Sequence, residues 1–172
     1  LSLHDALPIF ADARLLVING LGFEGWLPRL LQASGSKAPI AVATKGIMPR
    51  KLGGHDDPHA WQSVANAKIY VANIRDGLIA AAPDKAAVFK ANADAYLARL
   101  EALDREVHEA VAKIPEVRRK VISTHDAFGY FADAYGITFF SPLSVSTDSE
   151  PSARDIAAIV AQIKLAKIPA VF

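Results

Sequence analysis

The side chains best suited to chemistry in this sequence are histidines, because its 172 residues include five histidines and no cysteine. Two of them, His59 and His125, lie in polar segments at the borders of apolar ones. A neutral imidazole is a good ligand for zinc and other first-row metal ions. The lack of cysteine excludes a thiolate zinc site, thiol catalysis and a disulfide framework. We therefore interpret His59 and His125 as candidate metal ligands.

The neighbours of these two histidines suit a ligand role. Pro58 restricts the residue before it to extended geometry and so stiffens the approach to His59, and Trp61 would shield the site from water. His125 follows an apolar run and opens a predicted helix, which places it at the carboxyl end of a strand, where open α/β sheets bind ligands. Taken alone, each histidine is more often a surface or hydrogen-bonded core residue. The residues themselves therefore indicate a possible metal site between two parts of the chain, and no more.

The other histidines and three carboxylates have lesser parts in this interpretation. His55 and His59 are four residues apart, a chelating distance on a helix, but Pro58 predicts a loop, so joint capture of a metal by this pair is weakly supported. His108 is expected on a solvated helix face, and His4 has no role. A carboxylate beside a metal-binding histidine usually orients it. The candidates for that role, or for a general base, are Asp56, Asp57 and Asp126.

Alternating strands and helices would position these side chains. Short apolar runs at 15–18 and 40–43 predict strands buried on both faces. Helices are expected at 23–31, before a stop at Gly35, and at 64–82, with a polar loop over 45–58. The order strand, helix, strand, helix is typical of an α/β fold.

A long helix is predicted over residues 83–114, where apolar residues recur every three or four positions. Thirty helical residues span about 45 Å, more than a helix packed across a small sheet needs. We interpret it as a connection between two lobes, and the alternative is one arm of a helical hairpin or coiled coil. Beyond it the alternation resumes, with strands at 121–124, 137–140 and 168–172 and helices at 128–135 and after a capping box at 152–155.

Composition narrows the classes of function. Hydrophobic residues make up 52% and charged residues 22% of the chain, as in globular proteins. The formal net charge of +1 lacks the basic excess that nucleic-acid binding requires. No apolar run reaches the length of a membrane span, and no signal peptide is visible. The chain begins without methionine and ends within an apolar run, so we expect a piece of a longer protein.

Four strings in this order match a known family: Asn-Gly-Leu-Gly-Phe-Glu-Gly-Trp-Leu at 19–27, Asp-Pro-His-Ala-Trp at 57–61, Thr-His-Asp-Ala-Phe-Gly-Tyr-Phe at 124–131 and Ser-Glu-Pro-Ser at 149–152. With the long helix between the second and third, the chain resembles the solute-binding proteins of zinc and manganese ABC transporters, the ZnuA/TroA-like group. The resemblance implies an α/β fold with two lobes containing small parallel sheets, joined by one long rigid helix and incomplete at both ends. The implied domains are a partial N-terminal lobe at 11–82, a linking helix at 83–114 and a partial C-terminal lobe at 115–172.

The same resemblance implies ligands and a metal. His59 matches the family's ligand from the N-terminal lobe, and His125 matches the first ligand from the C-terminal lobe. Relatives with histidine at the second position tend to carry zinc and those with glutamate manganese, so we expect Zn²⁺ ahead of Mn²⁺. The family's other two ligands, an upstream histidine that His4 does not match and a downstream acidic residue, are missing. We therefore expect these 172 residues alone to bind zinc weakly or not at all.

The resulting expectation is a binding protein without catalysis, in the periplasm or at the outer cell surface. It would capture a divalent transition metal between its lobes and deliver it to an ABC permease in the membrane. We expect a monomer with no nucleic-acid partner. The alternative is a metal-dependent hydrolase that uses His59 and His125 with Asp126 as base. A third interpretation is a helical module that dimerises through Leu100 and Leu103.

Overall fold

The computed structural model describes residues 3–123, 125–141 and 153–171. Contacts within the chain divide it into two compact units, Leu1–Ala102 and Leu103–Phe172. The division falls inside the long helix. The lobe limits expected from the sequence, 11–82 and 115–172, stay a prediction.

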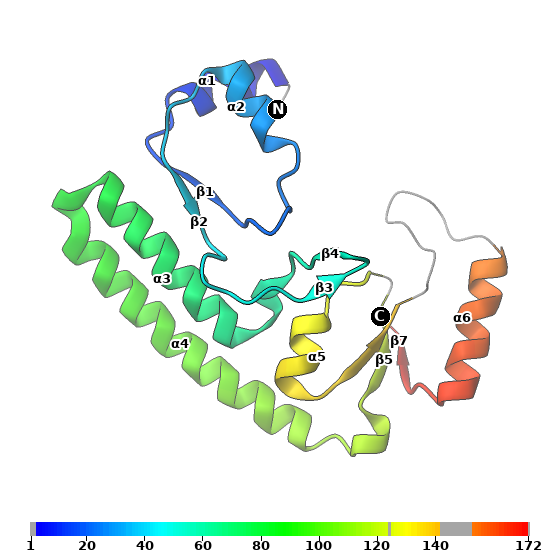
Figure 1. The fold of residues 1–172 in the computed structure, drawn as a ribbon. Helices are drawn as coiled ribbons and strands as arrows, with labels where there is room; N and C mark the ends of the chain where they lie inside the picture. The colour runs from blue at the N-terminus through cyan, green and yellow to red at the C-terminus, as the bar shows by residue number, and fades with distance from the viewer. Residues whose placement is uncertain (1–2, 124, 142–152, 172) are drawn as a thin grey trace. The chain divides into compact units, whose positions relative to one another are not determined.

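The first unit combines helices with two small sheets (Figure 1). Leu16–Ile18 (β1) pairs in parallel with Ile40–Val42 (β2). The connection between them contains Leu27–Ser34 (α2), which ends at Gly35 in the left-handed conformation with φ 66°, as the sequence predicted. The other elements of this unit, before the long helix, are Leu3–Ala11 (α1), Lys51–Leu52 (β3), His55–Asp56 (β4), Val64–Ala81 (α3) and the 3-10 turns Ala60–Gln62 (η1) and Pro83–Lys85 (η2).

The strands β1 and β2 are less buried than expected. Val17 is 46% exposed and Ile40 is 45% exposed, so burial on both faces is wrong for these strands. Helix α3 packs closely on β2, since a β-carbon at Gly77 would lie 2.7 Å from that of Ala41. The close approach of α3 to β2 therefore leaves Val17 and Ile40 accessible to solvent.

The segment 45–58, expected to be one polar loop, contains a short antiparallel hairpin. Strands β3 and β4 pair across Gly53 and Gly54. These glycines have φ of 56° and 85°, and two successive positive values are what a two-residue hairpin turn requires. Strands of two residues are too short to show an alternating pattern, so no periodicity marks them.

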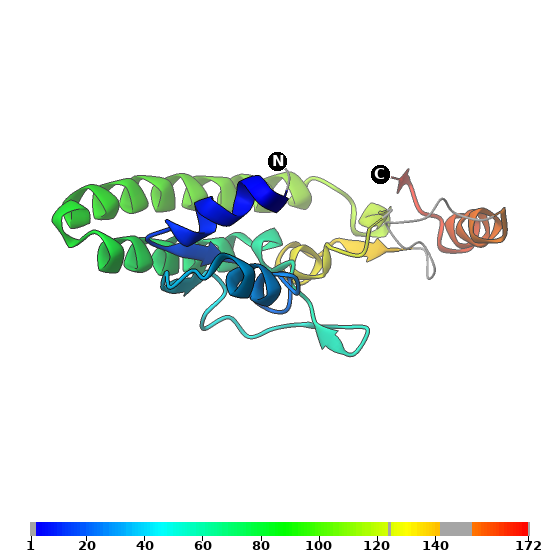
Figure 2. The same ribbon diagram turned by 90° about the horizontal axis from the view of Figure 1, so that it is seen from above.

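The long helix is confirmed as Ala86–Ala112 (α4), which has 27 residues and spans about 40 Å. Its first part runs alongside α3, and η2 joins the two helices (Figures 1 and 2). The Lys68 ammonium on α3 lies 3.1 Å from the Glu101 carboxylate on α4. This part of α4 is therefore one arm of a helical hairpin, the alternative considered above, and the helix continues without a break into the second unit.

The second unit is built on a parallel sheet with the strand order β6-β5-β7. Lys120–Ile122 (β5) lies between Thr138–Phe140 (β6) and Ala170–Val171 (β7), and Ile122 at its end is 2% exposed. The other elements, beyond the end of α4, are the 3-10 turn Glu116–Arg118 (η3) and the helices Gly129–Tyr135 (α5) and Ala153–Ala166 (α6). The predicted strands are confirmed with shorter bounds. Ser152 of the expected capping box lies outside the described residues.

Parallel strands connected through helices in both units confirm the α/β class with small parallel sheets and one long helix. In the part of the chain that the structure describes, no helix is both long and apolar enough to cross a membrane.

Candidate metal site

His59 lies directly before η1 and is almost buried, with 8% of its surface exposed. The Asp57 carboxylate holds it. The Oδ1 atom of Asp57 accepts a hydrogen bond from the backbone N–H of His59 at 3.0 Å and lies 2.8 Å from Nδ1 of the ring. Carboxylates in this arrangement are usual around metal-binding imidazoles. The first candidate ligand is therefore a buried ring with a fixed orientation.

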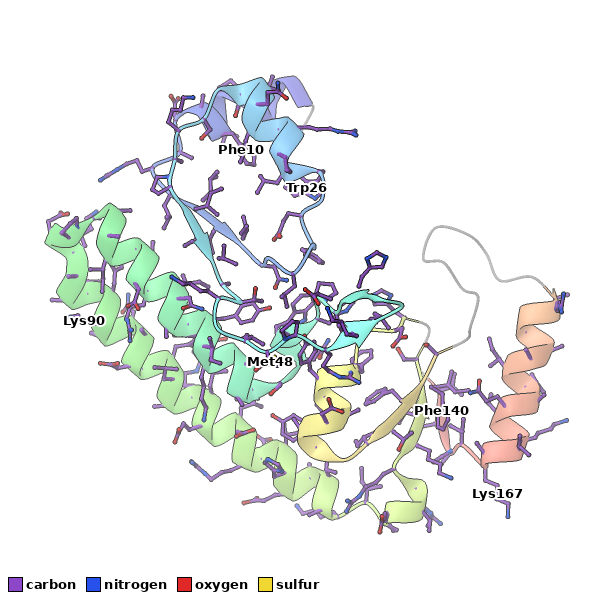
Figure 3. The ribbon with its side chains drawn as sticks, viewed as in Figure 1. Phe10, Trp26, Met48, Lys90, Phe140 and Lys167 are labelled. Carbon is purple, nitrogen blue, oxygen red and sulfur yellow. The ribbon has the colours of Figure 1, made fainter. Side chains whose placement is uncertain are left out.

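Aromatic side chains lie beside the His59 ring. The ring centre of Trp61 is 5.2 Å away in an edge-to-face arrangement, and Phe23 packs in the same manner on Trp61 at 5.6 Å. Both aromatic residues keep part of their surface in contact with solvent, so the shielding expected of Trp61 is partial. Figure 3 shows Trp26 at the start of α2 and Met48 in the segment before β3, and both are exposed.

Asn19, directly after β1, ties its own loop to the loop before η1. Its side-chain amide donates to the Pro58 carbonyl at 3.0 Å, and its amide oxygen accepts a hydrogen bond from the Tyr70 hydroxyl. Glu24 closes the Asn19 loop, because its carboxylate accepts from the backbone N–H groups of Asn19 at 2.6 Å and Gly20 at 3.0 Å. No role for the side chains of Asn19 and Glu24 was predicted from the sequence. The available signal was the Asn-Gly pair after an apolar strand, which marks a turn without naming its partners.

His125 lies in the second unit, just after β5, and is exposed. The Ser123 hydroxyl donates to the His125 carbonyl at 2.9 Å and lies 3.3 Å from the His125 backbone nitrogen, whose hydrogen it accepts. These bonds form a turn that places His125 at the carboxyl end of a parallel strand, as the sequence predicted.

His59 and His125 belong to different units, so their convergence on one ion stays a prediction. Among the described residues, no group of three or more histidine, aspartate or glutamate side chains could hold a metal ion. A site built by these two histidines alone would supply two nitrogen donors, fewer than the four that structural zinc sites use.

The other residues singled out from the sequence have simpler roles. His55 is exposed in β4, and Asp56 beside it forms an ion pair with a lysine of β3. The side chain of His108 is exposed on α4, the solvated face that was expected. Asp126 is exposed in the turn after β5. The side chain of His4 lies outside the described part of the chain.

A cavity of about 630 Å³ lies between β2 and α3 in the first unit. Its walls are mostly apolar, with one lysine, one asparagine and one aspartate, and no histidine lines it. The cavity therefore offers no imidazole to a metal ion. The residues around it are Leu15, Pro39, Ile40, Ala41, Val42, Lys45, Gly46, Asn73, Asp76, Gly77 and Ala80.

The fold and the sequence both match known proteins. The structure of the periplasmic zinc binding protein TroA from Treponema pallidum is similar with a TM-score of 0.87 and 30% identity, over 98% of this chain and 62% of that one. Among curated proteins, the manganese-binding lipoprotein MntA of Halalkalibacterium halodurans is 36% identical over 94% of this chain and 54% of its own length. The iron-binding protein YfeA of Yersinia pestis is 32% identical over 99% of this chain and 58% of its own length.

The relatives named above form a class of α/β proteins that are named for binding metal ions. The sequence matches the ZnuA family, described as zinc-uptake complex component A periplasmic, over residues 5–172. The chain belongs to this family, which confirms the resemblance stated from the sequence. It spans about half the length of the curated relatives it matches, 54% of one and 58% of the other.

Proposed function

We propose that this chain is part of an extracytoplasmic solute-binding protein that captures a divalent metal ion, zinc by preference, and delivers it to an ABC permease. The observation that carries the proposal is the almost buried His59 ring held by the Asp57 carboxylate. A neutral imidazole held in this way is a common metal ligand. Family membership supports the proposal, since the named relatives are metal-binding proteins.

The choice of zinc rests on the ligand type. The relatives are named for manganese, iron and zinc, so similarity alone does not select the ion. Imidazole nitrogen suits zinc, whereas carboxylate and carbonyl oxygens suit manganese. A site that combines His59 with His125 would therefore favour Zn²⁺ over Mn²⁺.

The proposed location rests on the same class of protein. Relatives named as periplasmic proteins or lipoproteins support a place in the periplasm or at the outer cell surface. The proposal also includes an ABC permease as the partner and a monomer as the working form. The hydrolase alternative gains no support. The relatives named above are binding proteins, and Asp126, its proposed base, is exposed to solvent.

The test is a zinc titration of the chain labelled with ¹⁵N at histidine, because NMR shifts detect weak as well as tight binding. We expect zinc to move the ring resonances of His59 and His125, and His59→Ala and His125→Ala each to weaken binding at least about tenfold. The matched controls His55→Ala and His108→Ala should leave the affinity unchanged. Wild-type affinity in both ligand variants would contradict the proposal. Tighter binding of Mn²⁺ than of Zn²⁺ would contradict the choice of zinc.

A further inference from the structure

We propose that Asp57 is a positioning residue that keeps the proton of the neutral His59 ring on Nδ1 and so presents the Nε2 lone pair to the metal ion. The inference rests on the proposed function, which identifies the metal ion that Nε2 would bind. The state of the ring, however, can be measured with no metal present.

One carboxylate oxygen contacts both the main chain and the ring of His59. Oδ1 of Asp57 lies 3.0 Å from the backbone nitrogen of His59 and 2.8 Å from Nδ1 of its ring. The first hydrogen bond holds the main chain of His59, and the second holds the ring, so a rotation of the ring would break the second bond. A ring ordered before the ion arrives loses less conformational freedom on binding, which favours affinity.

The position of the proton follows from the chemistry of the acceptor. An ionised carboxylate has no hydrogen to donate, so it can only accept hydrogen bonds. Nδ1 of His59 must therefore be the donor, and in a neutral imidazole the lone pair is then on Nε2. Because a metal ion binds to the unprotonated nitrogen, Nε2 is the ligand atom that this contact selects.

The surroundings of Asp57 hold its carboxylate in the loop. The side chain is 3% exposed, and its Oδ2 lies 3.9 Å from Nη1 of Arg50. The backbone N–H of Asp57 donates to the Arg50 carbonyl at 2.8 Å. A buried charged carboxylate needs an opposite charge and hydrogen bonds, and Arg50 and His59 supply them. Asp57 is therefore a fixed part of the site.

A purely structural role for Asp57 would require only the bond to the His59 backbone. Aspartate and asparagine both make this local turn by accepting an N–H two residues further on. The contact with the ring is the feature that separates positioning from turn formation. An asparagine amide offers Nδ1 either an oxygen or an N–H group, so it would preserve the turn but no longer select one form of the ring.

The experiment compares the wild-type chain with Asp57→Asn and with the matched control Asp56→Asn. Asp56 is the adjacent acid, and its carboxylate pairs with Lys51 in the hairpin. Two-bond ¹H–¹⁵N NMR spectra of histidine-labelled protein distinguish a ring nitrogen that carries a proton from one that carries a lone pair. The spectra are recorded without metal in mildly alkaline buffer, where imidazoles are neutral, and zinc chloride is then titrated into each sample.

We expect His59 in the Nδ1–H form in wild type and Asp56→Asn, with zinc moving its Nε2 resonance. Asp57→Asn should show a mixture of the two ring forms and a zinc affinity about 10- to 100-fold lower. An Nε2–H ring in the wild type, a zinc shift at Nδ1, or an Asp57→Asn chain with wild-type spectrum and affinity would overturn the proposal.

Two further outcomes are informative. The wild-type spectrum decides the ring form even if Asp57→Asn fails to fold. If zinc moves no His59 resonance while the wild-type ring is in the Nδ1–H form, the proposed binding of zinc at His59 is overturned and the contact between Asp57 and the ring is upheld.

Discussion

Asn19 offers no ligand to the proposed metal site, yet its side chain connects two loops of the first unit. It bonds the Pro58 carbonyl, 39 positions away, and the Tyr70 hydroxyl, 51 positions away. The loop that carries His59 is therefore held from outside as well as by its own Asp57. Metal-site geometry in proteins depends on such supporting contacts.

Replacement of Asn19 by alanine should destabilise the chain by about 1–3 kcal/mol, because the Pro58 carbonyl and the Tyr70 hydroxyl each lose a hydrogen-bond partner. Urea unfolding followed by circular dichroism measures the change. The control is Asn92→Ala on α4, where the side chain is exposed, and we expect it to stay within about 0.5 kcal/mol of wild type. Equal stability of the two variants would show that the Asn19 bonds contribute nothing.

Residue types and local spacing sufficed to single out His59, His125 and Asp57. Their chemistry is visible in the sequence, since imidazole binds metals and a nearby carboxylate can orient it. Asn19 and Glu24 could not be assigned in this way. Amide and carboxylate side chains have many possible partners, and those of Asn19 come from distant segments that only the folded chain brings together.

At the scale of elements, Gly77 sets how closely α3 approaches β2. A methyl group there would lie 2.7 Å from the Ala41 β-carbon, so Gly77→Ala must push the helix from the strand. Alanine favours helix over glycine by about 1 kcal/mol, but overpacking costs about 1–3 kcal/mol. We therefore expect a net loss of stability in urea unfolding.

The matched control for Gly77→Ala is Gly25→Ala, because nothing lies within 4 Å of a β-carbon at Gly25. We expect this variant to unfold within about 0.5 kcal/mol of wild type. If Gly77→Ala were instead more stable than wild type, the close approach of α3 and β2 would be easily relaxed and the packing argument would be wrong.

Tyr135 links α5 to α4 within the second unit. Its hydroxyl donates to the Asp104 carboxylate at 2.8 Å, and its buried ring packs against His108 at 4.9 Å. Tyr135→Phe keeps the ring and removes this bond, so we expect a loss of about 1 kcal/mol. Amide hydrogen exchange in α5 should become faster. Tyr96→Phe at an exposed position of α4 is the control and should leave that exchange unchanged.

Periodicity over many residues predicted the long helix, and short apolar runs predicted the parallel strands. The hairpin β3–β4 was missed since its strands have two residues each. Exposure of Val17 and Ile40 was missed for another reason. A short apolar run indicates a strand, but whether its faces are covered depends on how many neighbours the folded chain provides.

At the scale of the whole molecule, a metal site with only two imidazole ligands would hold zinc weakly. No group of three or more potential ligand residues gathers in the described part of the chain. We expect isothermal titration to give a dissociation constant weaker than about 1 μM, equivalent to less than about 8 kcal/mol of binding free energy. Submicromolar zinc affinity for these 172 residues would contradict this prediction.

The alternation of strands and helices predicted the α/β class, and four short strings in order along most of the chain indicated the family. The position of the boundary between the two units could not be predicted from the sequence. Helix α4 has the same apolar spacing on both sides of residue 102, and no proline or glycine interrupts it. A boundary within a regular helix leaves no local mark in the residue pattern.

The contact between Trp61 and His59 also supplies an optical reporter. The chain has two tryptophans, and replacing exposed Trp26 by phenylalanine would leave the indole of Trp61 as the single strong emitter, 5.2 Å from the imidazole centre. Indole fluorescence responds to charge in its immediate surroundings, so the emission intensity of this variant should follow the arrival of a cation at His59 without any attached dye.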